Sequence, residues 1–415
     1  MNAIFFGIVL VAFIAGAING TMGEITLGAV DSAKSAVTLA IGLVGIMSLF
    51  LGLMQVMQEA GALRVIARII RPVMVRLFPN VPEDHPAMGA MIMNLAANAL
   101  GLANAATPFG IKAMQELEKL NGEKGTATNA MVLFLAINTS AVTLLPTGVI
   151  GLRAAMGSTD PAAILPSTLF ASACATVVGV TVCKLLERVP YFAKTAPPMN
   201  RDGLELKQKV EGDLSQDGSG SMWPFVLVVK GMILLVVLAI IGGQAVSNWI
   251  IPTLIVGMLA VGVIRGIKVY EVFIEGAKDG FNVALRIIPY LVAILVAVGM
   301  FRASGALGTM VHYLGIVTEP LGMPGEALPM ALLRPLSGSG AYGVMASTME
   351  AAGPDSYVGY LVSTLQGSTE TTFYVLAVYF GSVGVSRLRH SMFAALAADL
   401  AGVIGAVAIC RLLFG

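Results

Sequence analysis

The sequence predicts an all-α polytopic membrane protein, built as an inverted repeat with about nine transmembrane helices and two re-entrant helical hairpins. Composition gives the first reason, because hydrophobic residues make up 57% of the 415 and charged residues only 12%. Soluble domains carry roughly 25% charged residues. The second reason is a series of long apolar stretches, and the third is a pair of apolar stretches that polar residues and glycines interrupt.

The predicted membrane spans are apolar stretches near the length of about 20 residues that a helix needs to cross the hydrocarbon layer. They are residues 2–20, 37–58, 127–148, 162–187, 223–243, 247–265, 286–303, 357–384 and 391–413. The first stretch has no basic residues before it and no convincing cleavage signal after it. We therefore expect a retained transmembrane helix rather than a signal peptide.

A polar segment divides the chain into two halves. Residues 190–222 are rich in lysine and contain proline, glycine and serine, which is typical of a linker. We expect this segment to be cytoplasmic. The sequence thus predicts a first membrane half at 1–189 and a second at 223–415.

Two further apolar stretches, 86–120 and 326–354, are broken in the middle. Cytoplasmic loops carry an excess of Lys and Arg, and this rule decides the path of the first stretch. If 86–120 enters the membrane and returns, the basic residues before it, in its last part and after it are all cytoplasmic together with the linker; they are Arg64, Arg68, Arg71, Arg76, Lys112, Lys119 and Lys124. The N-terminus is then also cytoplasmic, and the loops at 21–36 and 149–160 lie outside. The same reasoning makes 326–354 a hairpin that enters from the outside.

The two halves resemble each other in order and in sequence. Residues 32–63 align without a gap to 276–307, with AK near the start and GAL at the end of both. A broken hairpin, a span with a polar interruption and a closing span then follow in each half. The charge pattern places corresponding elements upside down relative to each other. Inverted repeats with broken helices are a recurring plan of secondary transporters, in which the binding site lies near the midplane.

The first hairpin contains the stretch NLAANALGLANAATPFG at 94–110. Asn94 and Asn98 lie one turn apart on one helix face, and Asn104 is expected at the tip. Thr107 followed by Pro108 is a good N-cap and first-turn pair, so we expect the returning arm to start there. These amides either pair the broken backbone of the hairpin or line a binding site, and the sequence leaves both readings open.

The second hairpin contains LRPLSGSGA at 333–341, with Arg334 before Ser337 and Ser339. A cation at this depth costs about 2.5–3.5 kcal/mol by insertion scales, so it needs a partner. Glu370 is the expected partner. The pair either locks two broken elements together, or Arg334 attracts an anionic group while Glu370 binds a proton or cation.

The interrupted spans supply the remaining candidates. They read INTSAVTLLPTG at 137–148 and QGSTETTFYVLA at 366–377. Non-helical backbone at membrane depth must be buried in protein or line a cavity. The expected substrate-binding residues here are Asn138, Thr139, Ser140, Gln366, Ser368 and Thr369. The hydroxyls of Thr139, Ser140, Ser368 and Thr369 are also a predicted Na⁺ site, although such hydroxyls commonly cap their own helix.

The sequence argues against other classes of function. No HExxH, GxSxG or Walker A motif occurs, so we expect no enzymatic activity and no resident cofactor. Net charge is +1, which gives no sign of nucleic-acid binding. Asp399 is expected to pair between helices, and the basic helix at 64–76 is expected on the membrane surface, against lipid headgroups.

Several long motifs resemble a known family. NLAANALGLANAATPFGIKAMQEL at 94–117 resembles spore maturation protein A, and LRPLSGSGA at 333–341 with GPDSYVGYLVSTLQGSTETTFYVLAVYFGSVG at 353–384 resembles spore maturation protein B. The resemblance covers nearly the whole chain, with the two parts fused through 190–222. It implies the nucleoside recognition, or gate, domain, which is shared with concentrative nucleoside transporters and the gate regions of ferrous-iron transporters.

These observations favour a secondary transporter of the bacterial cytoplasmic (inner) membrane. We expect alternating access for a small polar solute, anionic or nucleoside-like, with coupling to H⁺ or Na⁺. Membrane lipids and a second copy of the chain, in a homodimer, are the expected partners. The alternative is a non-transporting membrane assembly or signalling protein whose polar breaks are purely structural.

Overall fold

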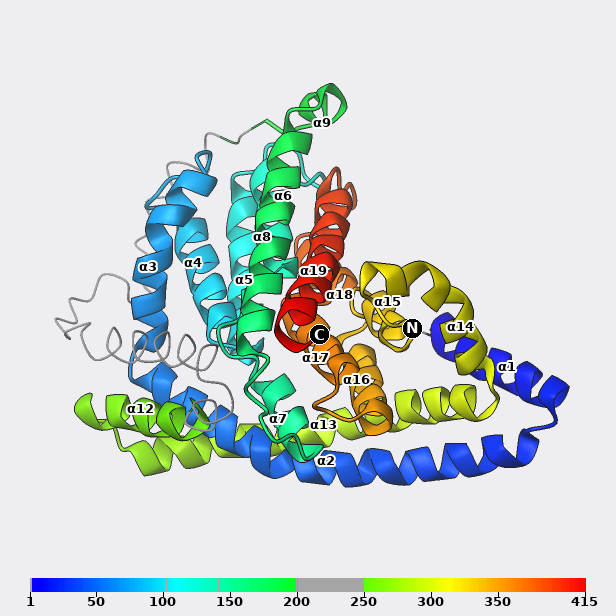
Figure 1. Ribbon diagram of the computed structural model, residues 1–415. Helices are drawn as coiled ribbons and strands as arrows, with labels where there is room; N and C mark the ends of the chain where they lie inside the picture. Colours follow the sequence, from blue (N-terminus) through cyan, green and yellow to red (C-terminus); the bar gives the residue numbers. More distant parts are fainter. Residues whose placement is uncertain (1, 102, 141, 199, 201–249) are drawn as a thin grey trace.

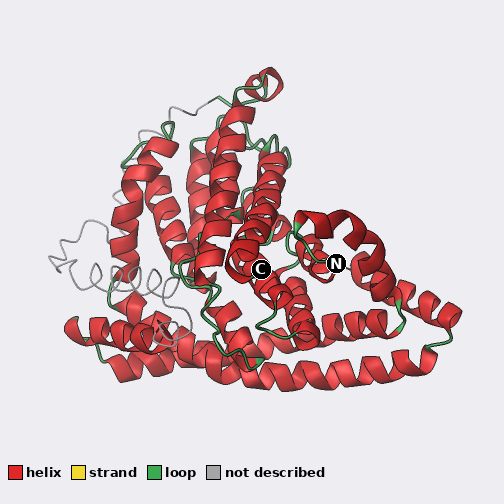
Figure 2. Ribbon diagram, in the orientation of Figure 1, coloured by secondary structure: helices red, strands yellow, loops and turns green. Residues whose placement is uncertain are grey.

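The computed structural model describes residues 2–101, 103–140, 142–198, 200 and 250–415. The described part is helical, with no strand and a single isolated bridge between Thr126 and Arg387 (Figure 2). Most of the predicted linker and the whole of the predicted span at 223–243 lie outside the described residues, so those two predictions are not tested.

Two sets of helices cross each other (Figure 1). One set stands roughly parallel and comprises α3 (Ala62–Leu77), α4 (Pro86–Ala99), α5 (Ala103–Lys119), α6 (Asn129–Thr139), α8 (Leu165–Glu187) and α19 (Ser391–Phe414). Across the foot of this set run two long helices, α2 (Met22–Glu59) and α13 (Val269–Ala303). Smaller elements flank them: α1 (Asn2–Asn19), α9 (Pro190–Lys194), α12 (Ile250–Ile264), α14 (Ala306–Thr318) and the 3₁₀ turns Glu319–Leu321 and Gly325–Ala327.

Three described helices are long and apolar enough to cross a membrane: α2, α8 and α19. A fourth candidate is the pair Leu291–Ala303 and Ala306–Ile316, which is bent by 81°. Helix α2 differs from the sequence-based expectation of a loop at 21–36, because it runs unbroken from Met22. The chain turns instead at Gly20, whose φ is +73°, and no proline interrupts the residues that follow.

The first hairpin consists of α4 and α5, which pack against each other. Pro86 occupies the first turn of α4, where its missing N–H costs nothing, and the Nδ1 atom of His85 accepts from the N–H of Ala87. The arms meet at Gly101, whose φ of +75° favours glycine. The prediction that the returning arm starts at Thr107 is wrong, since α5 begins at Ala103. Pro108 lies inside α5 and removes a single helical hydrogen bond.

The second hairpin consists of α15 (Leu328–Leu333) and α16 (Gly338–Ala352). The Ser337 hydroxyl accepts a 3.0 Å hydrogen bond from the N–H of Gly340 and so caps α16. The segment SGSG is therefore a cap and first helical turn rather than an open loop.

Each predicted interrupted span is a pair of short helices. In the first half, α6 and α7 (Thr147–Ala155) flank a first break at 140–146, of which residue 141 is not described. In the second half, α17 (Tyr357–Ser368) and α18 (Thr372–Gly381) flank a second break at Thr369–Thr371. Thr128 caps α6 and Ser356 caps α17 in the same way.

Small residues let α2 and α13 approach closely. A Cβ atom on Gly280 would lie 2.5 Å from Ser48 Cα and 2.6 Å from the Met47 carbonyl oxygen. Gly276 is equally tight against the Leu51 carbonyl oxygen, at 2.6 Å. Backbone contacts of this kind cannot relax as a flexible side chain can, so glycine is required at these positions.

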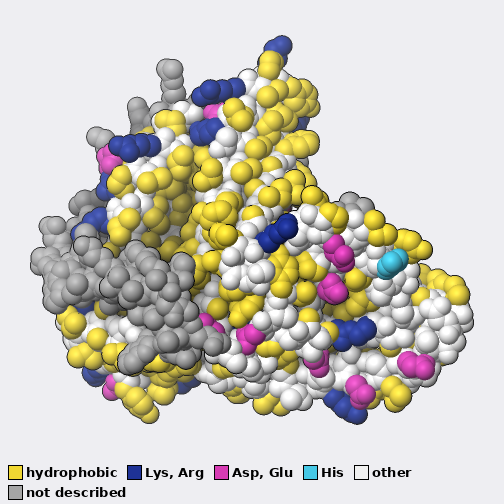
Figure 3. All heavy atoms as spheres, in the orientation of Figure 1, with side chains coloured by type: hydrophobic (Ala, Val, Ile, Leu, Met, Phe, Trp, Pro, Cys, Tyr) yellow, Lys and Arg dark blue, Asp and Glu magenta, His cyan; other side chains and the backbone are white. Residues whose placement is uncertain are grey.

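The exterior is consistent with an apolar environment. Figure 3 shows hydrophobic side chains over much of the visible face, with Lys and Arg gathered near α9 at the top and mixed charges along the lower edge near α2 and α13. Large apolar side chains are exposed on the candidate spans as well, among them Leu27, Ile41, Val177, Leu400 and Ile404. In water this surface would be unfavourable.

The close packing of α2 on α13 makes a testable prediction. Gly280→Ala places a methyl group against backbone atoms and should cost about 1–3 kcal/mol, measured as a lower melting temperature of the purified protein in detergent. Gly45→Ala is the matched control, because it lies in the same helix pair and a Cβ there meets nothing within 4 Å. Equal melting temperatures of the two variants would contradict the packing.

Candidate functional site

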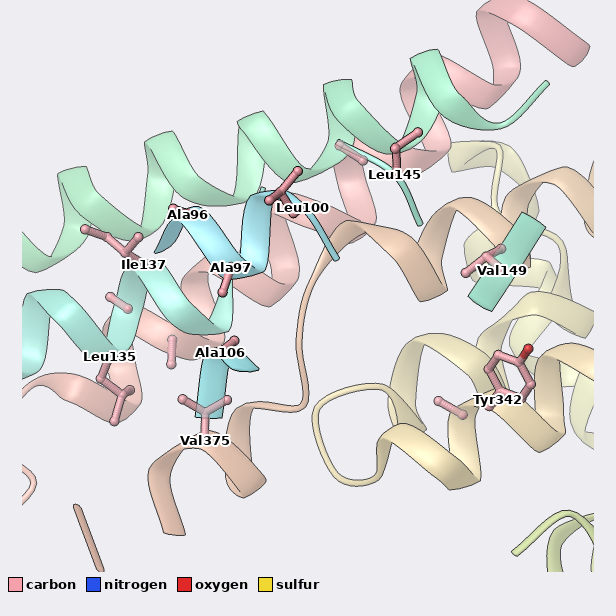
Figure 4. Packing of buried hydrophobic residues seen from close by; sticks show 14 of the residues in the cluster. Ala96, Ala97, Leu100, Ala106, Leu135, Ile137, Leu145, Val149, Tyr342 and Val375 are labelled. Atoms are coloured by element: carbon pink, nitrogen blue, oxygen red, sulfur yellow. The ribbon is translucent and has the colours of Figure 1, made fainter. Parts of the chain in front are cut away.

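A cavity of about 210 Å³ lies where the two hairpins meet the two breaks. Its walls come from the first hairpin (Asn98, Gly101), the first break and α7 (Thr143, Leu145–Val149), the second hairpin (Arg334, Gly338, Tyr342), and the end of α17 with the second break (Gln366, Gly367, Thr369, Glu370). Figure 4 shows Leu145, Val149 and Tyr342 from these walls, with Leu100 at the end of α4. The sequence predicted that these four segments would converge.

Each hairpin tip is held by the break of its own half. The N–H of Leu144 in the first break donates to the Ala99 carbonyl at 2.9 Å, and the N–H of Phe373 after the second break donates to the Pro335 carbonyl at 3.0 Å. The tip glycines fit tightly. A Cβ atom on Gly101 would lie 2.8 Å from the Leu145 carbonyl oxygen, and one on Gly338 would lie 2.7 Å from Thr371 Oγ1.

The Arg334 guanidinium donates most of its hydrogen bonds to the second break and the end of α17. Its Nε donates to the Gln366 carbonyl at 3.1 Å, one terminal nitrogen donates to Thr371 Oγ1 at 2.9 Å, and the other donates to the Thr369 carbonyl. The side chain thereby satisfies carbonyls left without partners at the end of α17. Glu370 lies farther away, with 3.8 Å between charged atoms, and its side chain is 49% exposed. The expected ion pair is present, but capping the backbone is the larger role of Arg334.

Hydrogen-bond acceptors face the cavity from the second half. Glu370 presents a carboxylate there, while its N–H donates to the Thr139 carbonyl at 2.8 Å and so joins the two breaks. The side-chain oxygen of Gln366 is buried and has no partner in the described part of the chain. A ligand that carries N–H or O–H donors would bond to the Glu370 carboxylate, and it would reach the Gln366 oxygen only after that side chain turns toward the cavity.

Three of the predicted amides form one network with Tyr379 of α18. Asn98 donates to the Asn138 side-chain oxygen at 2.9 Å, and the Tyr379 hydroxyl donates to the same oxygen at 3.3 Å. Asn94 donates to the Ala106 carbonyl at 2.7 Å and to the Tyr379 hydroxyl at 3.1 Å. Only Asn98 reaches the cavity wall, so Asn94 and Asn138 support the hairpin from behind. The side chain of Asn104 lies outside the described residues.

The predicted hydroxyls mostly bond to their own helices. Thr139 and Ser140 donate to the Ala136 carbonyl, and Ser368 donates to the Leu365 carbonyl, each at 2.9 Å. These contacts match the expectation that such groups cap local backbone. Thr369 lines the cavity, whereas Thr107, Ser337 and Ser339 are not among its lining residues. The predicted Na⁺ site at Thr139, Ser140, Ser368 and Thr369 stays a prediction.

Sequence reasoning missed several lining residues. Tyr342 closes one side and donates to the Gly148 carbonyl at 2.7 Å, and Thr143 and the Leu145–Val149 segment form another side. The PTG motif at 146–148 was a usable signal, because proline and glycine inside an apolar span mark a break. Tyr342 carries no comparable signal, since an aromatic residue two positions after SGSG has the appearance of ordinary core.

The outer clamp, named after the face on which the charge pattern predicts it, is a polar cluster around Arg153, a residue that the sequence placed in a loop. Arg153 of α7 is fully buried, donates to the Pro354 carbonyl at 2.6 Å, pairs with Asp355 at 2.8 Å and lies 4.4 Å from the Tyr360 ring centroid. Burial would raise the pKa of Asp355, but hydrogen bonds from Ser158 and Thr159 with the Arg153 charge hold it below its ordinary value. The clamp ties α7 to the loop before α17.

The inner clamp is its counterpart at the other end of the molecule. Arg389, which follows α18, donates to the Ala127 carbonyl at 3.1 Å and to Asn129 Oδ1 at 2.6 Å, and Arg387 pairs with Glu123 at 3.0 Å. Both arginines thus bind the loop before α6. In each clamp, arginines at or just after the C-terminal end of the broken span of one half bind the loop that precedes the broken span of the other half.

Comparison with known proteins follows the same two regions. The model of the family described as "Gate: Nucleoside recognition" matches residues 40–156 and 284–386, which together make more than half of the chain. The matched regions contain both hairpins and both breaks. No solved structure matches the chain at a significant level.

Curated relatives include two proteins of Bacillus subtilis. Spore maturation protein B is 45% identical over 174 residues, covering 41% of this chain and 98% of the relative. Spore maturation protein A is 39% identical over 195 residues, covering 47% of this chain and 97% of the relative. The inner membrane protein YjiG of Escherichia coli is 35% identical over 81 residues, covering 19% of this chain and 53% of the relative. Together with the apolar helices, these relatives indicate that the chain is a membrane protein.

The different roles of Arg334 and Glu370 can be separated by stability. Arg334→Ala leaves two carbonyls and a hydroxyl without their donor and should cost about 2–5 kcal/mol, seen as a clear fall in melting temperature. Glu370→Gln changes a half-exposed group and should stay within about 0.5 kcal/mol of the parent. A large loss of stability for Glu370→Gln, or none for Arg334→Ala, would contradict this assignment.

Proposed function

This chain belongs to the nucleoside recognition family, and we propose that it is a secondary transporter of the bacterial cytoplasmic membrane. The solute would bind in the cavity between the hairpin tips and the breaks. The observation that carries the proposal is the convergence of four broken elements on one polar cavity inside an apolar helical body. Transporter sites are typically built from discontinuous helices at the interface of two repeats.

Packing of α2 against α13 supports an inverted repeat. The alignment of 32–63 with 276–307 makes Ser32 correspond to Gly276, and Gln55 to Gly299. In the structure a Cβ atom on Gly299 would meet Ser32, and one on Gly276 would meet Gln55. Each contact is therefore the image of the other under exchange of the two halves. A pseudo-two-fold axis between the helices is the simplest arrangement that gives this pairing.

The hairpins and breaks at the site also make contacts that correspond under exchange of the two halves. Each hairpin tip accepts one backbone hydrogen bond from the break of its own half, and each half lends a tyrosine to the other: Tyr342 reaches Gly148, and Tyr379 reaches Asn94. The family model covers both sets of elements. We infer that α4–α5 and α15–α16 are re-entrant hairpins that enter from opposite faces, within a fold of about nine spans.

The two clamps support alternating access. They lie at opposite ends of the broken spans and each joins the two halves through buried or partly buried arginine contacts. Opening a path from one face would release one clamp while the other stays closed. Coupling to H⁺ or Na⁺ would supply the free energy for accumulation.

The dimensions and chemistry of the cavity constrain the solute. A volume of about 210 Å³ is room for about seven water molecules, and it is below the roughly 300 Å³ at which drug-sized ligand pockets begin. Arg334 is largely occupied by the protein's own oxygens, so the expectation of an anionic solute loses its main support. Glu370, Gln366 and Asn98 favour a small polar solute with hydrogen-bond donors. Because the cavity is partly open, a nucleoside would either extend through its opening or require it to widen.

A second candidate is a membrane assembly component that moves no solute. The observation in its favour is that most of the predicted polar residues satisfy the protein's own backbone. The names of two relatives refer to spore maturation and not to transport. This candidate predicts that substitutions at the cavity wall leave function unchanged.

Reconstitution tests the proposal. Purified protein is first screened for thermal stabilisation by nucleosides, amino acids and small amines, and a stabilising compound is then radiolabelled for counterflow in liposomes. Glu370→Gln should lower uptake at least about tenfold, since a hydrogen bond to a charged group contributes about 1.5–3 kcal/mol. Glu350→Gln, an exposed change on α16 away from the cavity, should leave uptake unchanged. Equal uptake by protein-free liposomes and by the parent protein for every stabilising compound would refute transport.

A further inference from the structure

Asp399 is a buried carboxyl group in the middle of α19, one of the helices apolar enough to cross a membrane. Its side chain is only 6% exposed. It faces α18, and it does not line the central cavity. Ionisable residues inside membrane spans are costly and usually functional.

Among the described residues, one oxygen of Asp399 has a hydrogen-bond partner and the other has none. Oδ2 accepts a 2.7 Å hydrogen bond from the Thr372 hydroxyl, while Oδ1 is buried with no hydrogen-bond partner in the described part of the chain. No described cation lies within ion-pair distance, and Arg334, whose field reaches Asp399, is already bound to the second break. A buried carboxylate without a cation is strongly disfavoured, and such a group becomes neutral by taking up a proton.

The elements around Asp399 offer little other charge. Helices α6 and α17 contain no Asp, Glu, Lys, Arg or His, and α18 contributes only tyrosines. Helix α8 places the thiol of Cys174 opposite Gly405 and carries Lys184 and Glu187 only in its last turn. The charged form of Asp399 is favoured by the Thr372 hydroxyl, by the start of α18 and by the more distant Arg334, and the described parts of α6, α8 and α17 add no cation beside it.

Helix packing does not require a carboxyl group here. In the first half, α8 makes the corresponding link to its break with a neutral hydroxyl, because Thr176 donates to the Ser140 carbonyl at 2.9 Å. Small residues provide the close contacts, since a Cβ atom on Gly402 would lie 2.8 Å from Thr369 and one on Gly179 would lie 3.0 Å from Ala398. The two halves therefore differ at this link, because the second half makes it with a titratable group, Asp399.

We propose that Asp399 is the proton-binding residue of this transporter, with the coupling proton carried on Oδ1 while Oδ2 keeps its bond from Thr372. The proposal rests on the transport function proposed above. Thr372 directly follows Thr371, whose hydroxyl accepts from Arg334, and Glu370 precedes both. Loss of the proton would place a negative charge beside the start of α18. This charge would attract the Thr372 hydroxyl and the Arg334 guanidinium. The charge state of Asp399 would thereby act on the break that forms the cavity wall.

Infrared spectroscopy tests the proposal without a solute. The full chain, labelled with ¹³C at the aspartate side-chain carboxyl, is reconstituted in lipid and titrated from acidic to alkaline pH. We expect a protonated aspartic-acid carbonyl band that persists to neutral pH, is absent in Asp399→Asn and is retained in Asp355→Asn. No such band in the parent protein, or an unchanged band in Asp399→Asn, would overturn the proposal.

Thr372→Val is a second variant that tests the proposal even if Asp399→Asn does not fold. It removes the hydrogen bond to Oδ2 and should shift the frequency of the same band, because the carboxyl group loses its donor. An unshifted band would show that the titrating group is not Asp399. Since the spectra need no solute, a missing band contradicts the role of Asp399 alone. A normal band with no uptake of any stabilising compound contradicts the transport proposal alone.

Discussion

The need to satisfy broken backbone inside an apolar helical body governs the rest of this structure. Helices that stop and restart leave N–H and C=O groups without partners, and in hydrocarbon each such group costs several kcal/mol. The chain meets this requirement by pairing each hairpin tip with a break and the two breaks with each other. Three backbone hydrogen bonds do this directly: they join Ala99 to Leu144, Pro335 to Phe373 and Thr139 to Glu370. Arg334 donates to two further carbonyls, those of Gln366 and Thr369.

This constraint also explains the form of the cavity. Tip glycines are needed where a hairpin meets a break, because Gly101 and Gly338 leave no room for a Cβ atom. The amide groups of Asn94 and Asn138 and the Ser368 hydroxyl donate to backbone carbonyls, so few polar groups remain to face the cavity. Most polar residues of the breaks thus support the fold, and in the proposed transporter Asn98, Gln366 and Glu370 would be the residues that recognise the solute.

Much of this arrangement followed from the sequence. The positions of both breaks, a turn within 94–110 and the approach of Glu370 to Arg334 were predicted, because proline, glycine and amide residues in apolar stretches leave a clear signal. Local signals misplaced the start of α5, since Thr107-Pro108 is a good cap that the tight turn at Gly101 made unnecessary. The outer clamp was missed because a single arginine in a short loop is normally a surface charge. Burial of Arg153 depends on Pro354 and Asp355, some 200 residues away, and no local pattern encodes that contact.

The central claim is that the cavity opens alternately to the two faces of the membrane, and thiol accessibility under a locked clamp tests it most directly. In a variant without Cys174, Cys183 and Cys410, cysteines replace Thr159 and Asp355, which touch across the outer clamp, and Thr143 on the cavity wall is the third cysteine. With the clamp reduced, an impermeant maleimide should label position 143 from the outside. With the clamp oxidised, outside labelling should be lost while labelling from the cytoplasmic face persists. Identical labelling from both faces in the two states would contradict alternating access.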